Sequence, residues 1–459
     1  MKSFISEDNI EQAICTRLSL PEYGWKRIAC DPSVEAQNDV ATTGRDNVAE
    51  CILPKVFYNA LRRINPQIDT ETLSAIARDF RKDYSGTDMV DTNYRFYNQI
   101  RNGIKVKVKN NGKEDFDIVK LIDFDNVENN DFHCVNQMWI KGRFRYRRPD
   151  VLLFVNGLPV VFMELKNSTV KVEESYNKNL VSYRQDIPNI FALNQICVLS
   201  NGLQTKIGAW NSTYDFFFEW LRVDDEKEVL DREQIAEHGL SITNLIDGLF
   251  RKERLLDYIE NFIFFDNKRI KIIAKNHQYL GVNNLMKNVG RRAELNGKLG
   301  VFWHTQGSGK TALSFYNVKS LTDYFAKKQK PVKFYFIVDR LDLLEQASSE
   351  FAMRGLIVRL AQSREELMAD FHDNTVRHNA EGKPGDGIHG AVALDQSGEK
   401  RVFGVCRIRF HGRDRRAGLH ERGHDEDREE DQKHGIDDLT DPDRDLAGAQ
   451  GEKEHCGKE

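Results

Sequence analysis

The sequence contains no long hydrophobic run. No stretch approaches the roughly 18 consecutive apolar residues that a membrane-spanning helix needs, although 40% of the 459 residues are hydrophobic. The opening residues, MKSFISEDNIEQ, carry acids where a secretory signal would have its apolar core. We therefore expect a cytoplasmic chain with no membrane association.

Cysteine is scarce and never occurs in a CxxC pair. The seven cysteines are Cys15, Cys30, Cys51, Cys134, Cys197, Cys406 and Cys456. Because they are scattered and odd in number, neither a zinc site nor a disulfide framework is expected. The net charge of −4 excludes a uniformly basic coat, but it leaves room for a local basic groove that binds nucleic acid.

The chain is long enough for two or three domains, and its composition and hydrophobic pattern divide it into three regions. Residues 1–231 begin with a helix, marked by apolar residues at helical spacing after a Ser6 cap. The strands expected after it are residues 117–124, 132–141, 150–155, 159–166 and 195–199. Asn156-Gly157 predicts a tight hairpin between two of these strands. The charged stretch 223–237 predicts a linker or an exposed helix.

Residues 240–380 alternate helical and strand-like segments, as is typical of an α/β domain. Buried parallel strands are predicted at 300–303 and 332–338, with a helix starting near Gly309 between them. Residues 382–459 are rich in charge, glycine and histidine and poor in aromatics, which predicts a disordered tail. The abrupt change suggests a reading frame lost near Lys383.

A phosphate-binding loop is predicted in GVFWHTQGSGKTALSF, between an apolar stretch and a helix. Its residues are Gly307, Ser308, Gly309, Lys310 and Thr311. Glycines let backbone N–H groups point at phosphate oxygens, while the lysine reaches the β and γ phosphates of ATP and the threonine hydroxyl holds Mg²⁺. The strict motif has a glycine where His304 stands. No DEAD- or DEAH-like box follows Thr311, so we expect an incomplete motor.

A second constellation, RPDVLLFVNGLPVVFMELKN, combines two acids with a lysine. Asp150 opens one strand of the expected hairpin, and Glu164 and Lys166 share a face of the other. Burying a charged side chain in such an apolar strand costs free energy, so the charges are expected to take part in a functional site. Two carboxylates can hold Mg²⁺ and a lysine can stabilise negative charge during phosphodiester cleavage. The pattern resembles the PD-(D/E)xK nuclease fold, and a salt bridge in an edge strand is the alternative.

A basic stretch, KGRFRYRRPD, leads into this constellation. Arg143, Arg145 and Arg147 alternate with aromatic residues, so an extended strand would place the cations on one face that leads to Asp150. We predict that this face contacts DNA phosphates. A solvated strand face is the alternative.

The acidic constellation followed by the phosphate loop resembles the restriction (HsdR-type) subunit of type I restriction-modification systems. The stretches IPNIFALNQICVLSNG, IAKNHQYLGVNNLM and FIVDRLDLLEQ agree with that family, from about residue 5 to residue 380. The resemblance implies a PD-(D/E)xK domain in 1–231 and the start of a RecA-like helicase domain in 240–380. It also implies Mg²⁺ and ATP as cofactors, double-stranded DNA as substrate, and methyltransferase and specificity subunits as partners.

The family's functional residues map onto positions in both regions. Asp150, Glu164 and Lys166 match the nuclease site, with Asp150 and Glu164 as metal ligands. Further matches are Glu11 for an early-helix acid, Asn179 and Tyr183 for a QxxxY motif, Gln278 near the adenine, and Arg340, Asp342 and Gln346 for the next helicase motif. Asn179 departs from the expected glutamine.

The family's later motor motifs, second RecA-like domain and helical docking region have no counterpart in this sequence. A remnant that only binds DNA or nucleotide is therefore an alternative to an enzyme. A nuclease–helicase fusion of DNA repair is a third possibility, and the stretch VDRLDLLEQ argues against it.

Overall fold

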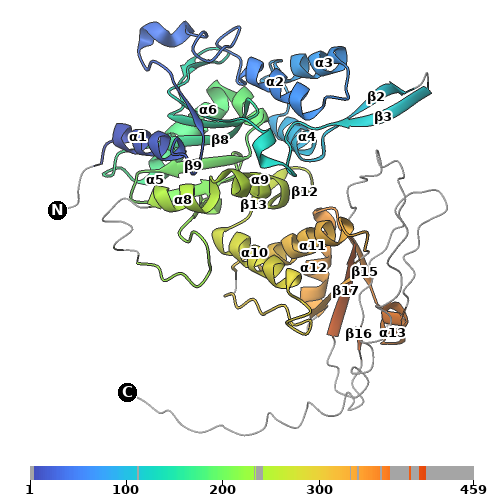
Figure 1. Cartoon of the computed structure of the whole chain (residues 1–459). Helices are drawn as coiled ribbons and strands as arrows, with labels where there is room; N and C mark the ends of the chain where they lie inside the picture. The colour runs from blue at the N-terminus through green and yellow to red at the C-terminus, as the bar shows by residue number, and fades with distance from the viewer. Residues whose placement is uncertain are drawn as a thin grey trace, which may run out of the picture. The chain divides into compact units, whose positions relative to one another are not determined.

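The chain is described here from a computed structural model (Figure 1). The described residues are 5–110, 113–231, 233, 241–305, 307–330, 332–338, 341–361, 364–372, 392–393 and 403–409. Among them, no helix is both long enough and apolar enough to cross a membrane.

A mixed seven-stranded sheet lies at the centre of the N-terminal region, in the order β1-β4-β7-β8-β9-β10-β11 (Figure 1). Its strands are β1 (Lys26–Ala29), β4 (Phe132–Asn136), β7 (Val151–Val155), β8 (Leu158–Leu165), β9 (Ile196–Ser200), β10 (Thr205–Gly208) and β11 (Phe218–Glu219). β1 pairs with β4 and β8 with β9 in parallel, whereas the other neighbours are antiparallel. The N-terminal region is therefore a mixed α/β structure.

Helices and small hairpins surround this sheet. The helices are α1 (Glu7–Leu18), α2 (Pro54–Ile64), α3 (Thr70–Phe80), α4 (Met89–Asn102), α5 (Val172–Glu174) and α6 (Val181–Asp186), with the short turns η1 (Val34–Asn38), η2 (Val127–Asn129), η3 (Ser175–Leu180), η4 (Pro188–Ala192) and η5 (Tyr214–Phe216). The hairpins are β2 (Ile104–Asn110) with β3 (Lys113–Val119), and β5 (Ile140–Lys141) with β6 (Tyr146–Arg147). The expected first helix is confirmed as α1, and the Ser6 hydroxyl accepts the Asn9 N–H at its start.

The hairpin predicted at Asn156-Gly157 is confirmed. The two residues have φ values of 50° and 78°, the left-handed conformations of a tight turn between antiparallel strands. A Cβ on Gly157 would lie 2.6 Å from the Leu53 carbonyl oxygen, so the position also requires glycine for space. Every residue of β7 and β8 is buried, as their apolar composition predicts.

Two of the other expected strands are only partly correct. β3 ends at Val119, so the expectation of a strand over 117–124 fails for its second half. The expected strand 132–141 divides into β4 and β5, because Gln137 takes a φ of 59° and ends the ladder with β7. The strand expected at 195–199 is confirmed as β9.

Two hydrophobic clusters cover the opposite faces of the central sheet. Leu153 and Met163 belong to one cluster, which includes apolar residues of α1, whereas Leu152 and Phe162 belong to the other, which includes residues of η4 and α6. Since side chains alternate along a strand, Glu164 lies on the same face as Phe162. The acid therefore lies beneath α6 rather than beneath α1.

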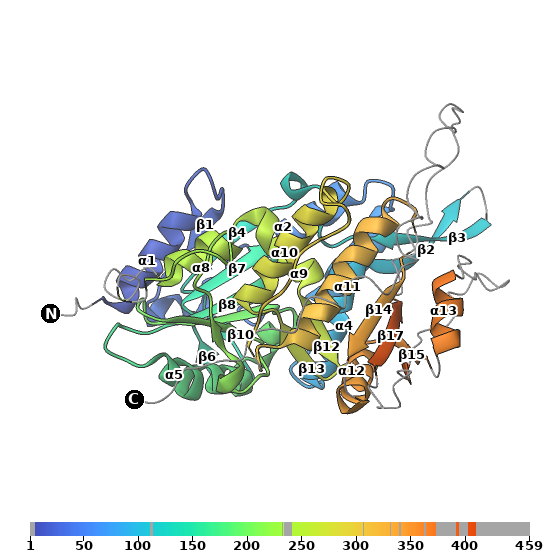
Figure 2. The same cartoon turned by 90° about the horizontal axis from the view of Figure 1, so that it is seen from below.

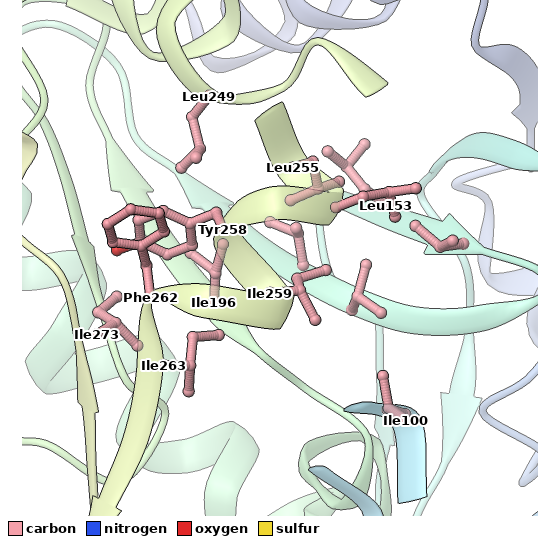
Figure 3. Packing of buried hydrophobic residues seen from close by; sticks show 14 of the residues in the cluster. Ile100, Leu153, Ile196, Leu249, Leu255, Tyr258, Ile259, Phe262, Ile263 and Ile273 are labelled. Atoms are coloured by element: carbon pink, nitrogen blue, oxygen red, sulfur yellow. The ribbon is translucent and has the colours of Figure 1, made fainter. Parts of the chain in front are cut away.

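Residues 241–274 pack against the N-terminal region. They form α8 (Ser241–Leu249), α9 (Lys252–Asn261) and a hairpin of β12 (Ile263–Asp266) and β13 (Ile270–Ile273). Figure 3 shows their apolar side chains beside Leu153 and Ile196 of the central sheet, within one hydrophobic cluster. Polar contacts also join the two parts: Arg17 donates to Asp247 at 2.7 and 2.6 Å.

The remaining elements lie beyond residue 275. They are α10 (Asn276–Gly290), α11 (Lys310–Ala326), β14 (Phe334–Val338), α12 (Leu341–Met353), β15 (Ile357–Leu360), α13 (Arg364–His372), β16 (Val392–Ala393) and β17 (Phe403–Arg409). A small sheet has the order β14-β17-β15, and its strands lie near α12 in Figure 2. β17 is antiparallel to both of its neighbours.

The buried strand predicted at 300–303 is wrong. These residues have no regular structure, and Val301 and Trp303 are 88% and 94% exposed. A parallel strand is buried only where neighbours flank it, and within the described residues no strand pairs with this segment. The strand at 332–338 does form as β14, but it is half-buried and its partner β17 is antiparallel.

Most of the segment 382–459 lies outside the described residues, so the expectation of a disordered tail stays a prediction, and only two short segments of it are described. Val392–Ala393 and Phe403–Arg409 form β16 and β17. The second segment, FGVCRIR, is rich in aromatic and β-branched residues, a local preference for strand that the composition of the whole tail conceals. Residues 410–459 lie outside the described residues.

Candidate functional site

The hairpin of β7 and β8 brings the two predicted acids together. Asp150 stands directly before β7, and its Oδ2 accepts the backbone N–H of Leu165 at 2.7 Å. This bond ties the start of one strand to the end of the other. The carboxyl of Asp150 and that of Glu164, the residue before Leu165, are thus fixed at the same end of the hairpin.

Glu164 is only 2% exposed, and its two oxygens have different surroundings. Oε1 accepts the Lys166 ammonium at 3.1 Å and also the side-chain amide of Asn179. Oε2 is buried and has no hydrogen-bond partner. A buried carboxylate oxygen of this kind is costly unless something else binds it.

The electrostatics of the three groups are strongly perturbed. Burial raises the pKa of Asp150 to about 6. Burial, together with the negative charge of Asp150, raises the pKa of Glu164 to about 8. Burial alone would lower the pKa of the Lys166 ammonium, but nearby carboxylates, first that of Glu164, outweigh it and raise the pKa. The carboxyl pair therefore resists ionisation while the lysine keeps its charge.

The turn after β8 places two more predicted residues at this site. η3 is a π-helical turn, a local widening that is frequent at functional sites, and it carries Asn179 toward Glu164. The Tyr183 hydroxyl donates to the Arg148 carbonyl at 3.1 Å and lies close enough to Glu164 to lower the pKa of that carboxyl. Asn179, the position that departs from the family's glutamine, thus contacts the acid directly.

Glu11 approaches the site from α1. It is buried and accepts the side-chain amides of Asn136, at 2.8 Å, and Gln137. Burial raises the pKa of Glu11, while these two amides lower it. The negative charge of Glu11 also helps to raise the pKa of Asp150, because the two carboxylates repel each other.

Sequence reasoning missed three residues near these acids. Glu7 lies 3.8 Å from the Lys166 ammonium, and Asn136 and Gln137 hold Glu11. Glu7 precedes Glu11 by one helical turn on the same face, a spacing visible in the sequence. Nothing in the sequence pairs the amides with α1, because 125 residues separate Asn136 from Glu11.

The donor set fits a hard divalent cation with few protein ligands. Within the described residues, no group of three or more His, Cys, Asp or Glu forms a ready cage for a metal. Mg²⁺ does not require one, since it usually keeps several waters and binds one or two carboxylates. The unpartnered Oε2 of Glu164 and the neighbouring Asp150 carboxyl provide two such oxygens.

The basic stretch differs from the expected single strand. Its chain reverses between β5 and β6, where Gly142 N–H donates to the Arg145 carbonyl at 2.8 Å. Arg143 and Arg145 are exposed, but the Arg147 guanidinium donates to Asp186 at 2.6 Å. The expectation of one continuous cationic face is therefore wrong, because the turn and the ion pair separate the three arginines.

The predicted phosphate loop leads into a helix as expected. Gly307 and Gly309 have φ values of 76° and 87°, and α11 begins at Lys310. The Lys310 ammonium donates to the carbonyl oxygens of His304 and Thr305 at 3.2 and 3.1 Å. Thr311 is half-buried in the first turn of the helix, and the Ser308 hydroxyl is buried without a partner.

Gln278 lies against this loop from the start of α10. Its side-chain amide donates to the Gly309 carbonyl at 3.0 Å, and His277 Nε2 lies 3.1 Å from the Ser308 carbonyl oxygen. A Cβ on Gly309 would lie 2.6 Å from Gln278 Nε2, so the flexible amide would have to move aside, and the φ of 87° independently favours glycine.

Two residues of the next expected helicase motif lie on α12. Asp342 and Gln346 are exposed on α12, and Gln346 donates to Glu350 at 3.0 Å. Arg340 lies outside the described residues.

Comparison with known proteins identifies the family. Residues 4–216 match the family described as the N terminus of type I restriction enzyme R proteins, and residues 277–379 match the SWI2/SNF2 ATPase family. The chain belongs to the type I restriction enzyme R proteins. The first match contains Asp150, Glu164 and Lys166, and the second contains the phosphate loop.

Individual relatives agree with this assignment. The type I restriction enzyme HindI endonuclease subunit of Haemophilus influenzae is 32% identical over 375 residues, which cover 79% of this chain and 34% of that protein. The MjaIXP endonuclease subunit of Methanocaldococcus jannaschii is 34% identical over 351 residues, which cover 70% of this chain and 32% of that protein. The chain thus spans about a third of the length of these relatives.

Proposed function

We propose that Asp150, Glu164 and Lys166 form a metal-dependent DNA-cleaving site in a PD-(D/E)xK nuclease domain covering residues 1–231. The observation that carries the proposal is the buried, unpartnered Oε2 of Glu164 beside a second carboxyl and a lysine. Native proteins rarely leave a buried carboxylate oxygen without a partner. A divalent cation gives that oxygen a role and relieves the repulsion within the carboxyl pair.

In this proposal the chain's own groups prepare the site. Asp150 and Glu164 would hold Mg²⁺, which would supply Lewis-acid activation of the phosphate and of a water molecule. Asn179 and Lys166 occupy Oε1 of Glu164, so Oε2 is left to face the cation. The Lys166 ammonium also brings positive charge for the negative charge that develops on the phosphate. The Leu165 N–H fixes the orientation of Asp150.

We also propose that residues 240–380 form the start of a RecA-like domain that binds ATP at 307–311. The Lys310 ammonium donates hydrogen bonds to two neutral carbonyl oxygens. A phosphate oxygen carries negative charge, so it attracts the ammonium more strongly than a neutral carbonyl oxygen does. Double-stranded DNA is the proposed substrate of the whole protein, and methyltransferase and specificity subunits are its proposed partners. The roles of Arg340, Asp342 and Gln346 stay a prediction.

The nuclease proposal is tested on the full chain with plasmid DNA and Mg²⁺. Glu164→Gln keeps the size of the side chain but removes the charge that holds the cation. We expect it to abolish nicking and linearisation and to remove the rise in melting temperature that Mg²⁺ produces. Glu173→Gln, at an exposed acid of α5, is the matched control and is expected to behave as the wild type.

Two results would contradict the nuclease proposal. Full cleavage by Glu164→Gln would remove Glu164 from the site. A melting temperature raised by Mg²⁺ equally in the wild type and in Glu164→Gln would place the cation elsewhere.

A second candidate function, nucleotide binding without efficient hydrolysis, is favoured by the lack of a DEAD- or DEAH-like box after Thr311. Hydrolysis needs an acid that helps to hold the metal. We expect the chain to bind a fluorescent ATP analogue, Lys310→Ala to lose this binding, and phosphate release to be slow. Rapid phosphate release would show that another carboxylate completes the ATPase site.

A further inference from the structure

The fold brings together two cysteines that lie far apart in the sequence. Cys15 belongs to α1 and Cys134 to β4, and the Cys134 thiol donates to the Cys15 sulfur at 3.5 Å, although 119 positions separate the two residues. Both side chains are fully buried in the main hydrophobic cluster, and both are free thiols. The first helix and the central sheet therefore meet at a pair of thiols in direct contact.

Two other buried cysteines have different surroundings. The Cys51 thiol donates to the Ala49 carbonyl at 3.6 Å, and the Cys197 thiol donates to the side-chain oxygen of Asn194 at 3.5 Å. These two thiols thus have oxygen partners, whereas the pair has a contact between sulfurs. Such a contact stabilises the fold little, because sulfur is a weak donor and a weak acceptor. Packing would be served equally well by apolar side chains, so the pair points to thiol chemistry.

The surroundings of the pair favour reaction at Cys15. The hydrogen bond from Cys134 lowers the pKa of the Cys15 thiol, and the positive charge of Arg27 lowers it further, although burial opposes both. The same hydrogen bond, together with burial, raises the pKa of Cys134 well above its usual value. The thiolate is the nucleophilic form of cysteine. Cys15 is therefore the sulfur that ionises more readily, and Cys134 stays protonated beside it.

The pair lies one strand in from the edge of the central sheet. β1 is the edge strand, and its Arg27 pairs in register with Cys134 of β4. The Arg27 side chain is exposed and donates to Gln12 of α1 at 2.8 Å. α1 itself packs against β4 (Figure 2). A local opening of α1 from this edge would expose the pair to a small oxidant.

We propose that Cys15 and Cys134 are a modification site at which hydrogen peroxide forms a disulfide between α1 and β4. The Cys15 thiolate attacks one peroxide oxygen, the O–O bond breaks, and the departing hydroxide takes up the proton that the thiol had released, which leaves a sulfenic acid. The Cys134 sulfur then attacks the Cys15 sulfur. The S–S bond forms, the S–O bond breaks, and the departing hydroxide takes the Cys134 proton. Two thiols and one peroxide thus give one disulfide and two waters, with both sulfurs oxidised and both peroxide oxygens reduced.

The bond requires only a small movement of the two sulfurs. They lie 3.5 Å apart, and a disulfide holds them about 2.0 Å apart. Because the link would join positions 119 apart in the chain, it would restrict the unfolded state strongly and so stabilise the folded one. It would also fasten α1, which carries Glu11, to the strand that ends at its partner Asn136. The inference does not rest on the proposed function.

The test treats the native full chain with hydrogen peroxide and then blocks the remaining thiols with iodoacetamide. Peptide mass spectrometry without reduction is expected to find Cys15 linked to Cys134, and dithiothreitol is expected to remove the link. The melting temperature should rise on oxidation and return on reduction. Cys15→Ala and Cys134→Ala should each abolish the link and the rise. Cys197→Ala, which removes a buried cysteine outside the pair, is the matched control and should keep both.

Three results overturn the proposal. A sulfinic acid on Cys15 beside an unmodified Cys134 would show that the second sulfur does not attack the first. A pair that stays reduced while the exposed Met368 is converted to its sulfoxide would show that peroxide does not reach it. Linked peptides that contain Cys51 or Cys197 as often as the pair would show that disulfides form only in unfolded chains.

Discussion

Glu164 is the residue on which the candidate site depends most. It is buried at the end of an apolar strand, and both its burial and Asp150 oppose its ionisation, so its pKa of about 8 lies far above the ordinary value of 4.5. A group whose pKa is raised by folding binds its proton more tightly in the folded state. The stability of the cation-free protein must therefore depend on pH through this carboxyl.

We predict that, without divalent cations, Glu164 makes the free energy of unfolding fall as the pH rises from about 4.5 to about 8. In that window the unfolded chain has released the proton while the folded chain still holds it, so stability is lost toward higher pH. One such group contributes a slope of up to about 1.4 kcal/mol per pH unit. Denaturant titrations of the wild type and Glu164→Gln at several pH values measure the difference.

The variant isolates the contribution of Glu164 because glutamine does not titrate. Its stability is expected to vary less with pH than that of the wild type, and to exceed it above pH 8. Parallel pH profiles for the two proteins would contradict the raised pKa. The exposed Glu173→Gln serves again as the control.

Asn179 provides a second prediction at this scale. Its amide donates to Glu164 Oε1 and so favours the ionised carboxylate. We expect Asn179→Ala to raise the pKa of Glu164 further and to shift the pH profile of DNA cleavage toward higher pH. Asn179→Gln restores the donor that the family carries at this position and is expected to reverse the shift. A loss of cleavage that is equal at every pH would instead indicate a purely structural role.

At the scale of elements, the β7–β8 hairpin was the feature most accessible to prediction. Asn156-Gly157 encodes its turn locally, and the apolar strands on either side need no information from distant residues. The strand expected at 300–303 failed for the opposite reason. Its apolar residues are compatible with a buried strand, but burial depends on neighbouring strands that a local pattern cannot supply.

The turn itself can be tested by Gly157→Ala. The residue has a positive φ, and an added Cβ would approach the Leu53 carbonyl oxygen at 2.6 Å and the Phe57 nitrogen at 2.8 Å. Strain in the backbone and this collision together are expected to lower the free energy of unfolding by about 2–4 kcal/mol. Gly86→Ala, where an added Cβ meets nothing within 4 Å, should change it by less than about 0.5 kcal/mol. Equal denaturation midpoints for the two variants would contradict this account.

At the scale of the whole molecule, the sequence predicts a domain boundary near residue 231. The charged stretch 223–237 looked like a linker, but the apolar residues that follow it join the cluster beneath the central sheet. Trp25 donates to the Phe250 carbonyl at 3.1 Å, and the buried Lys271 donates to that of Asn194 at 2.6 Å. These contacts join residues far apart in the chain, so composition could not reveal them.

We therefore predict that a fragment ending at residue 275 is more stable than one ending at residue 231. The shorter fragment would expose the apolar surface that α8, α9 and the β12–β13 hairpin cover, at about 25 cal/mol for each Å². Thermal melts and limited proteolysis of the two fragments measure the difference. Equal melting temperatures and equal resistance to protease would show that residues 1–231 form a self-sufficient domain.

The contact between α1 and β4 has a consequence for the order of synthesis. Glu11 leaves the ribosome first, but its partner Asn136 follows 125 residues later, and at about 5–20 residues per second the wait is about 6–25 s. During this interval α1 cannot bury Ile14 and Leu18, which are fully buried in the finished protein. The nascent chain thus presents an amphipathic segment to chaperones for seconds, before the acids of the hairpin have been translated.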